Sequence, residues 1–146
     1  MIRIQQEDFS VAAELARLTA GGALCLFVGT VRGESQGRTV TAMTLEHYPA
    51  MAERTLARLE EEARRRWPLT DALVVHRHGP LQPGEQIVLV AVCSPHRAAA
   101  FDACRFLIDQ LKTSAPFWKS EETAEGDAWV AAREEDDAAA EKWKEA

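Results

Sequence analysis

The sequence predicts an α+β fold, in which a mixed or mainly antiparallel sheet packs against helices in a single domain covering residues 1–146. Helical and β-rich segments follow one another without the strict strand–helix alternation that a doubly wound parallel sheet requires. The length of 146 residues suits one domain, and 47% apolar with 27% charged residues is a composition that supports a packed core. We therefore expect one folded domain that ends in an acidic segment, residues 134–146.

The first part of the chain predicts one helix followed by two strands. Residues 10–18 have a helical pattern, and either Ser10 or Asp8 can cap its N-terminus. Residues 23–31 form an apolar run that is typical of a strand buried on both faces. A polar loop with two glycines follows, and the β-branched residues within 38–47 predict the second strand.

A long amphipathic helix is predicted from Pro49 to about Trp67, because proline suits the first helical turn. Its apolar stripe consists of Ala52, Leu56, Leu59 and Ala63. The glutamates at 60–62 each precede an arginine at 64–66 by four residues, a spacing worth about 0.2–0.5 kcal/mol per pair. The arginine run is therefore expected to lie on a solvated helix face, neutralised by the glutamates, and not to bind nucleic acid.

Two strands, a helix and a hairpin are predicted for the rest of the chain. Strands at 71–78 and 85–93 flank a loop rich in glycine and proline, and Ser94-Pro95 begins a helix that reaches about Lys112. The apolar face of this helix is expected to consist of Phe101, Cys104, Leu107, Ile108 and Leu111. The segments 116–122 and 128–132 can pair as a hairpin, and the tail is expected to be a short, solvated helix.

The distribution of charge excludes a general nucleic-acid binder. Residues 1–119 hold 14 basic and 13 acidic side chains, whereas residues 120–146 hold 3 basic and 10 acidic ones. This balance predicts no broad basic surface, although a local cationic pocket is compatible with it.

No apolar run reaches the roughly 18 residues of a membrane span, and the first residues do not form the apolar stretch of a signal peptide. We therefore expect a cytoplasmic protein without membrane or nucleic-acid partners.

The three cysteines, Cys25, Cys93 and Cys104, are expected to be reduced and to pack as small apolar side chains. They form no CxxC pair, and their odd number argues against a disulfide framework. All three lie in apolar segments, where free cysteines are usually buried. Reduced thiols agree with a cytosolic location.

The segment Ser94-Pro95-His96-Arg97 is a candidate anion site. The free amides and the dipole at the start of a helix attract anions, and a histidine and an arginine add hydrogen-bond donors. A cation in the first helical turn opposes the dipole, so its presence favours a bound phosphate or carboxylate. The alternative is a surface arginine beside a capping histidine.

Lys112 and Lys119 flank a proline break in the segment LKTSAPFWK. Lys112 also suits the end of a helix, where a cation complements the dipole. Lys119 follows Phe117-Trp118, and apolar neighbours or a second cation would make its amine usable in acid–base or nucleophilic chemistry. The sequence does not establish that the two lysines converge.

Three other patterns are weaker. Arg32 leaves the first strand at GTVRG, a glycine-rich exit that lacks the GK[ST] ending of a phosphate-binding P-loop. His76 and His78 have the spacing of two ligands on one strand face, but no third ligand is evident, so no metal site is expected. Glu46-His47-Tyr48 has no nucleophile beside it, which argues against a catalytic triad.

Together, the motifs resemble the large, catalytic subunit of molybdopterin synthase. The matching segments keep their order over most of the chain: GTVRG (29–33), TLEHYPAM (44–51), EEARRRWPL (61–69), HRHGPLQPGE (76–85), SPHRAAAF (94–101), LKTSAPFWKSE (111–121) and EGDAWV (125–130). Each segment alone is a weak signal. The ordered set, above all SPHR with LKTSAPFWK, is highly specific.

This resemblance implies a hammerhead-type α+β fold and a sulfurtransferase activity in molybdenum cofactor biosynthesis. A small ubiquitin-like partner would insert its C-terminal Gly-Gly thiocarboxylate into a pocket of this chain. Two rounds of sulfur transfer to cyclic pyranopterin monophosphate would form the dithiolene of molybdopterin, without a cofactor or metal. The implied assembly is a heterotetramer, in which a homodimer of the large subunit carries one small subunit at each end.

The resemblance also implies the residues of the site. It assigns catalysis to Lys119 and Lys112, which are expected to contact the substrates as well. The other expected substrate-binding residues are Thr30, Val31, Arg32, His96, Arg97, Ser120 and Glu121, with Arg133 as a further candidate. The chemistry agrees, because both reactants are anions and fixed cations reduce their repulsion. The thiocarboxylate is itself the nucleophile, so no protein cysteine is needed.

Two positions depart from the family pattern. Many members have a basic residue where this chain has Thr30, and another where it has Ser120. The missing charges leave open an alternative, a non-catalytic paralogue that binds a phosphorylated pterin. The sequence also leaves open whether the cations meet within one subunit or across a dimer.

Overall fold

The protein is built from two β-sheets and four α-helices in the described part of the chain, and the predicted α+β class is confirmed. The computed structural model describes residues 1–19, 21–114, 116–123, 126–130 and 134–145. In chain order, the elements are β1 (Ile2–Gln5), α1 (Val11–Leu15), β2 (Ala23–Thr30), β3 (Glu34–Ser35), β4 (Arg38–His47), α2 (Pro49–Arg66), β5 (Asp71–Arg77), β6 (Gly79–Leu81), β7 (Gln86–Ser94), α3 (Arg97–Thr113), β8 (Phe117–Thr123), β9 (Gly126–Val130), α4 (Glu134–Glu141) and a 3₁₀-helix, η1 (Lys142–Glu145).

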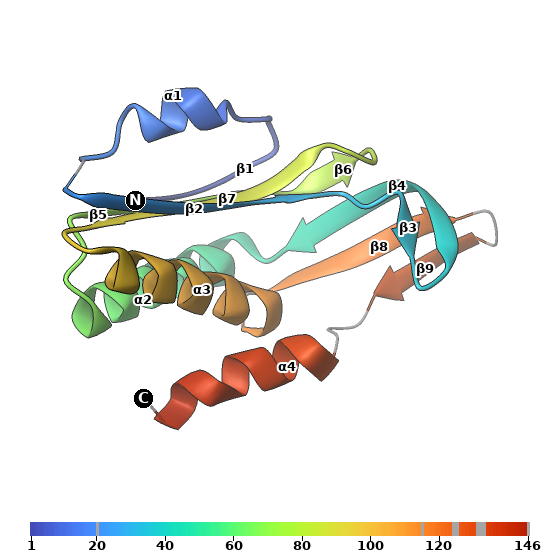
Figure 1. The fold of residues 1–146 in the computed structure, drawn as a ribbon. Helices are drawn as coiled ribbons and strands as arrows, with labels where there is room; N and C mark the ends of the chain where they lie inside the picture. The colour runs from blue at the N-terminus through green and yellow to red at the C-terminus, as the bar shows by residue number, and fades with distance from the viewer. Residues whose placement is uncertain (20, 115, 124–125, 131–133, 146) are drawn as a thin grey trace.

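The first sheet has the strand order β1-β5-β7-β2 and forms the centre of a three-layer arrangement. Helices α2 and α3 cover one face, and α1 lies over the other (Figure 1). β1 and β5 are parallel, whereas β5 and β2 both run antiparallel to β7. The two central strands are therefore buried on both faces, which explains their continuous apolar sequences.

The alternation of side chains along β5 and β7 divides the core into two clusters. Val74 and Val90 face α2 and α3, where they pack with Leu56 and Phe106. Their neighbours in the strands point to the opposite face, where Leu73, Val75, Leu89 and Ala91 pack with Phe9. The period-2 geometry of a strand produces this division.

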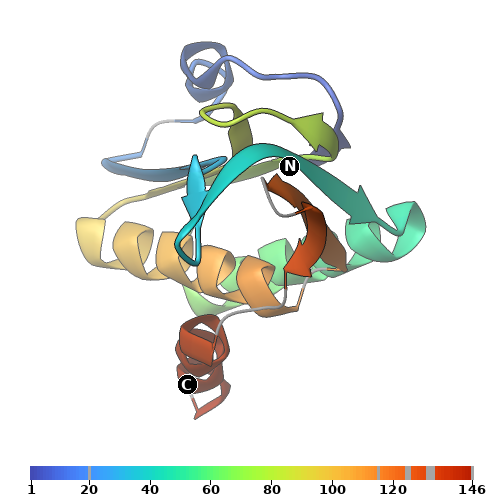
Figure 2. The same cartoon turned by 90° about the vertical axis from the view of Figure 1, so that its right-hand side faces the viewer.

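The second sheet has the order β3-β4-β8-β9, and β6 also pairs with β4. All of its pairings are antiparallel, as the predicted hairpin of residues 116–122 and 128–132 requires. Figure 2 shows β4 arching over β8 and β9. A third cluster holds this region together and consists of Val31, Met43, Leu45 and Leu81. This sheet places β8, with Lys119, beside the end of the first sheet.

The prediction that residues 23–31 are buried on both faces is wrong. They form the strand β2 as expected, but β2 lies at the edge of its sheet. Leu24 is 48% exposed and Leu26 is 39% exposed, and Phe27 beside them is also exposed. An apolar run indicates a strand, but it does not distinguish a central strand from an edge strand that another surface covers.

The predicted apolar face of α3 is partly wrong. Cys104 and Leu107 are buried as expected, but Phe101 is 62% exposed. Phe106, assigned to no face by the sequence, is 1% exposed and packs edge-on against Trp67. The reason is that α3 contacts both the sheet and α2, so its buried surface is wider than one helical stripe.

Other local expectations have mixed outcomes. Ser10 caps α1, and its hydroxyl accepts a hydrogen bond from the Ala13 amide at 3.2 Å. The ion pairs Glu60–Arg64 and Glu62–Arg66 form at 3.2 and 3.0 Å, whereas Arg65 approaches Glu62 instead of Glu61. The short strands β1, β3 and β6 were not predicted, because two to four residues carry too little periodicity.

The C-terminal segment forms a helix as predicted but is docked rather than fully solvated. Trp143 packs edge-on against Trp67 and Phe106. Its indole N–H donates to the Asp109 carboxylate at 2.7 Å, and Arg66 donates to its carbonyl oxygen at 3.0 Å. Trp143, together with the buried Ala140, thus attaches an otherwise polar tail to α2 and α3.

Cys93 and Cys104 are buried, Cys25 is half-buried, and all three thiols are free. None of the helices in the described ranges is both long and apolar enough to cross a membrane.

Candidate functional site

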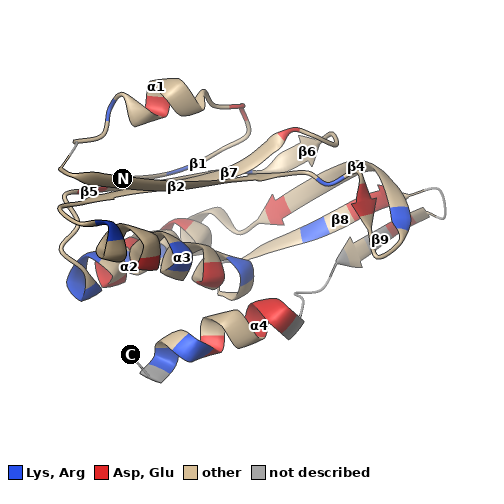
Figure 3. Cartoon of the chain, viewed as in Figure 1, with Lys and Arg blue, Asp and Glu red and all other residues tan. Residues whose placement is uncertain are grey.

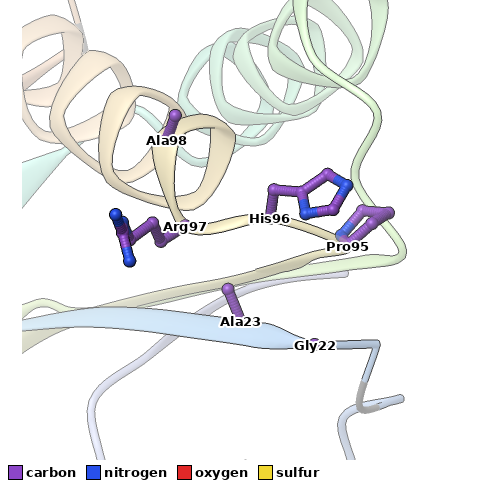
Figure 4. Close-up of a pocket in the computed structure, with 6 residues that line it drawn as sticks. All are labelled: Gly22, Ala23, Pro95, His96, Arg97 and Ala98. Carbon is purple, nitrogen blue, oxygen red and sulfur yellow. The ribbon is translucent and has the colours of Figure 1, made fainter.

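The start of α3 forms a pocket at the position of the SPHR motif. Its volume is about 450 Å³, and its lining consists of Gly22, Ala23, Pro95, His96, Arg97 and Ala98. His96 is the N-cap residue with extended backbone angles, and Arg97 begins the helix. Both side chains are exposed, and Figure 4 shows them above the first residue of β2.

The first-turn amides of α3 have no side-chain cap. The Ser94 hydroxyl, which could have capped the helix, donates to the carbonyl oxygen of His96 instead. The amides of the first helical turn have no acceptor within the helix, and they add a partial positive charge to that of Arg97. The pocket is therefore built to attract an anion.

Gly22 allows the chain to pass close to this loop. Its φ of +125° lies in a region that side chains disfavour, and a Cβ atom built on it would be 2.3 Å from the Pro95 carbonyl oxygen. No other residue fits this contact without a shift of the backbone. The shape of the pocket thus depends on this glycine.

The two candidate lysines lie at the other end of α3. Lys112 belongs to its last turn and is exposed, and Lys119 is half-buried in the middle of β8. In the sheet register, Lys119 pairs with Leu45 and Glu121 with Met43, so both side chains share the face of the third core cluster. Ser120 points to the opposite face of β8, beside Trp129.

Thr30, Val31 and Arg32 reach this same region from the end of β2. The side chain of Val31 is buried with Met43 and Leu45, the register partners of Glu121 and Lys119. Arg32 follows immediately and is exposed. The structure therefore brings six of the predicted residues, Thr30, Val31, Arg32, Lys119, Ser120 and Glu121, to the same end of the molecule, with Lys112 beside them.

A stack of rings joins the first sheet to the second next to these lysines. The ring of Phe117 lies 3.9 Å from that of His76 at 15°, and 5.8 Å from that of His47 at 14°. His78 lies 4.3 Å from His47. Burial lowers the pKa of His76 to about 4, with a further lowering by the nearby positive charge of Lys112. The sequence suggested only a metal site or a triad for these histidines, because ring contacts between distant strands leave no local sequence pattern.

The described residues do not support a metal site at His76 and His78. Nowhere in the described ranges do three His, Cys, Asp or Glu side chains gather closely enough to hold a metal ion. His78 also lies beyond the end of β5 instead of two positions along one strand. His47 contacts rings rather than a nucleophile.

Within one chain, the two groups of cations do not converge. Arg97 and Lys112 lie at opposite ends of α3, and a helix of this length separates them by about 22 Å. Figure 3 shows the basic positions at both ends of α3 and on β8. His96 and Arg97 are therefore remote from Lys112, Lys119 and Arg32 of the same chain. Arg133, the further candidate, lies outside the described residues.

Comparison with known proteins places these features in one family. Residues 4–114 match the family model described as "MoaE protein". The chain is 53% identical to the molybdopterin synthase catalytic subunit of Ralstonia nicotianae, with 97% of this chain and 83% of the relative covered. It is 51% identical to that of Escherichia coli, with 97% of both chains covered. The solved structure of the molybdopterin biosynthesis MoaE protein from Burkholderia ambifaria superposes with a TM-score of 0.83 at 51% identity, covering 98% of this chain and 97% of that one. The chain therefore belongs to the MoaE family of molybdopterin synthase catalytic subunits.

Proposed function

We propose that this protein is the catalytic subunit of a molybdopterin synthase. It transfers sulfur from the C-terminal thiocarboxylate of a small ubiquitin-like partner to cyclic pyranopterin monophosphate. In each round, one sulfur atom forms a bond to the pterin side chain, and water supplies the oxygen that converts the partner's thiocarboxylate to a carboxylate. Two rounds form the dithiolene of molybdopterin and open the cyclic phosphate.

The observation that carries this proposal is the division of the cations into two groups, one at each end of α3. His96 and Arg97, with the free amides of the first turn, suit the phosphate of the pterin. Lys112, Lys119 and Arg32 suit the thiocarboxylate tail and the reacting end of the pterin. Two anionic reactants need both groups at one site, because fixed cations reduce their repulsion.

A two-fold dimer across the edge of β2 would join the two groups. β2 begins beside Arg97 and ends at Thr30, and its length of about 23 Å matches the separation along α3. A two-fold axis near its middle would place the beginning of one β2 beside the end of the other. Leu24, Leu26, Phe27 and Phe101 expose apolar surface along this edge and helix, as expected for an interface. Each active site would then combine Arg97 of one subunit with Lys119 of the other.

In this arrangement, Lys119 and Lys112 are the catalytic residues. Lys119 is half-buried among apolar neighbours, where its ammonium group interacts strongly with the charge that develops during sulfur transfer. Thr30, Val31 and Glu121 would line the path by which the partner's tail reaches it, whereas Ser120 lies on the opposite face of β8 and would contact substrate only from that face. The alternative of a non-catalytic paralogue is disfavoured, because all five cations of the site are present.

We also propose a cytoplasmic location. The three cysteines are free thiols, in agreement with a reducing compartment. A thiocarboxylate donor is likewise a reduced sulfur species.

Reconstitution tests the proposed function. The purified protein is mixed with the thiocarboxylated partner and cyclic pyranopterin monophosphate, and the dithiolene product is measured by mass spectrometry. We expect turnover by the wild type and its loss in Lys119→Ala. Lys144→Ala is the matched control, because Lys144 is exposed on η1 and pairs with Glu141 away from the site. Binding of the pterin without product in the wild type would support the paralogue instead.

A further inference from the structure

The contact between the two sheets beside the lysines consists of three stacked rings. His76 from β5, Phe117 from β8 and His47 from β4 lie nearly parallel, at 15° and 14° between successive ring planes. His76 is buried, and its Nδ1 donates to the Arg77 carbonyl oxygen at 2.8 Å, because a carbonyl oxygen can only accept. This hydrogen bond fixes the plane of the imidazole against which Phe117 packs.

Phe117 controls the path of the chain between the two catalytic lysines. Lys112 lies in the last turn of α3 five residues earlier, and Lys119 follows two residues later on the same face of β8. Phe117 is the first residue of β8, so its contact with His76 joins the chain to the first sheet at the point where it enters the second sheet and pairs with β4. A displacement of this ring would shift the start of the strand that carries Lys119, and so its position relative to Lys112.

Burial and nearby positive charges favour the neutral form of His76. Burial lowers the pKa of His76 most, the hydrogen bond to the Arg77 carbonyl raises it, and the nearby charges of Lys112, His47 and His78 lower it further. A protonated ring would repel the Lys112 ammonium, whereas the neutral ring does not. A neutral His76 carries no positive charge, so it does not attract the anionic substrates away from Lys112 and Lys119.

We propose that His76, stacked on Phe117, is a positioning residue that sets the relative placement of Lys112 and Lys119. The proposal rests on the proposed function for its catalytic consequence. His76 does not contact the reacting atoms, and it acts through Phe117 and the chain that carries the lysines.

Steady-state kinetics of three variants test this role. His76→Ala removes the ring, His76→Phe keeps a stacking ring, and Val74→Ala removes volume from the same face of β5 without touching the stack. We expect kcat to fall by about tenfold or more in His76→Ala, with KM for the pterin within about twofold of the wild type. We expect kcat to stay within about threefold in His76→Phe and within about twofold in Val74→Ala. Equal kcat values for His76→Ala and Val74→Ala would overturn the proposal, as would equal losses in both His76 variants.

NMR provides a readout that does not depend on turnover. The Cε–Hε signals of Lys112 and Lys119 should shift in His76→Ala and coincide with those of the wild type in Val74→Ala. Unchanged lysine signals in His76→Ala would overturn the positioning role even if the protein is an active synthase. Shifted signals in a protein without turnover would retain the positioning role and reject the proposed function. If His76→Ala does not fold, Phe117→Leu removes the stacking partner and is expected to give the same kinetic and spectral changes.

Discussion

Replacing Gly22 by alanine should destabilise the protein and damage the anion pocket together. The new Cβ atom would lie 2.3 Å from the Pro95 carbonyl oxygen and 3.0 Å from its carbonyl carbon, so the backbone must move. A side chain at φ +125° costs about 1–3 kcal/mol, and relief of the overlap costs a similar amount, which gives about 4 kcal/mol in total at the middle of both ranges. For a chain of this size, that loss corresponds to a decrease in Tm of about 10 °C.

Calorimetry at neutral pH measures this effect, and Gly33→Ala is the matched control. A Cβ atom on Gly33 meets no atom within 4 Å, so we expect a change in stability below about 1 kcal/mol. Titration with cyclic pyranopterin monophosphate should show weaker binding by Gly22→Ala, because the displaced loop carries His96 and Arg97. A Tm of Gly22→Ala within about 2 °C of the wild type would refute the reasoning, since the overlap would then have been relieved without cost.

Three further predictions concern other parts of the molecule. Burial lowers the pKa of His76 from about 6.5 in the unfolded chain to about 4 in the folded protein. Because the unfolded chain then binds the proton more readily, the free energy of unfolding should fall by up to about 3 kcal/mol as the pH decreases from 6.5 to 4. In urea unfolding, the stability of His76→Phe should lack this part of the pH dependence. The same pH dependence in His76→Phe and the wild type would contradict the lowered pKa of His76. Leu26→Asp should give a folded monomer by analytical ultracentrifugation, without synthase activity, and an unchanged dimer would exclude β2 from the interface. Trp143→Ala should release α4 and η1, which would be seen as faster amide exchange in both elements. The free energy of unfolding should decrease by about 2–4 kcal/mol. Unchanged exchange would show that other contacts hold the tail.

The sequence determined the long elements and most of their boundaries. α2 begins at Pro49 and ends before Pro68, because proline fits the first turn of a helix and disfavours helix in the residue before it. The apolar stripe of α2 is buried as its spacing predicted. The strands β4, β5 and β7 have enough residues to show a β pattern. These are local properties, which a single sequence carries.

What could not be predicted depends on contacts between distant segments. β2 and the central strands have similar apolar sequences, and only the sheet order shows that β2 is at an edge. Trp143 attaches the tail through Trp67 and Phe106, which are remote from it in the sequence. The sequence identified the candidate cations and placed Arg97 and Lys112 at opposite ends of one predicted helix, but it could not show that Lys119 and Arg32 lie at the Lys112 end.

That separation leads to the most direct test of the account, which is complementation between two inactive variants. Arg97→Ala and Lys119→Ala are co-expressed with different affinity tags, and the heterodimer is isolated by two purification steps. If each site combines Arg97 of one subunit with Lys119 of the other, one of the two sites is intact, and the heterodimer should have about half the turnover of the wild-type dimer. A heterodimer as inactive as the two parent variants would contradict the shared site and leave the cations of each chain too far apart for the proposed reaction.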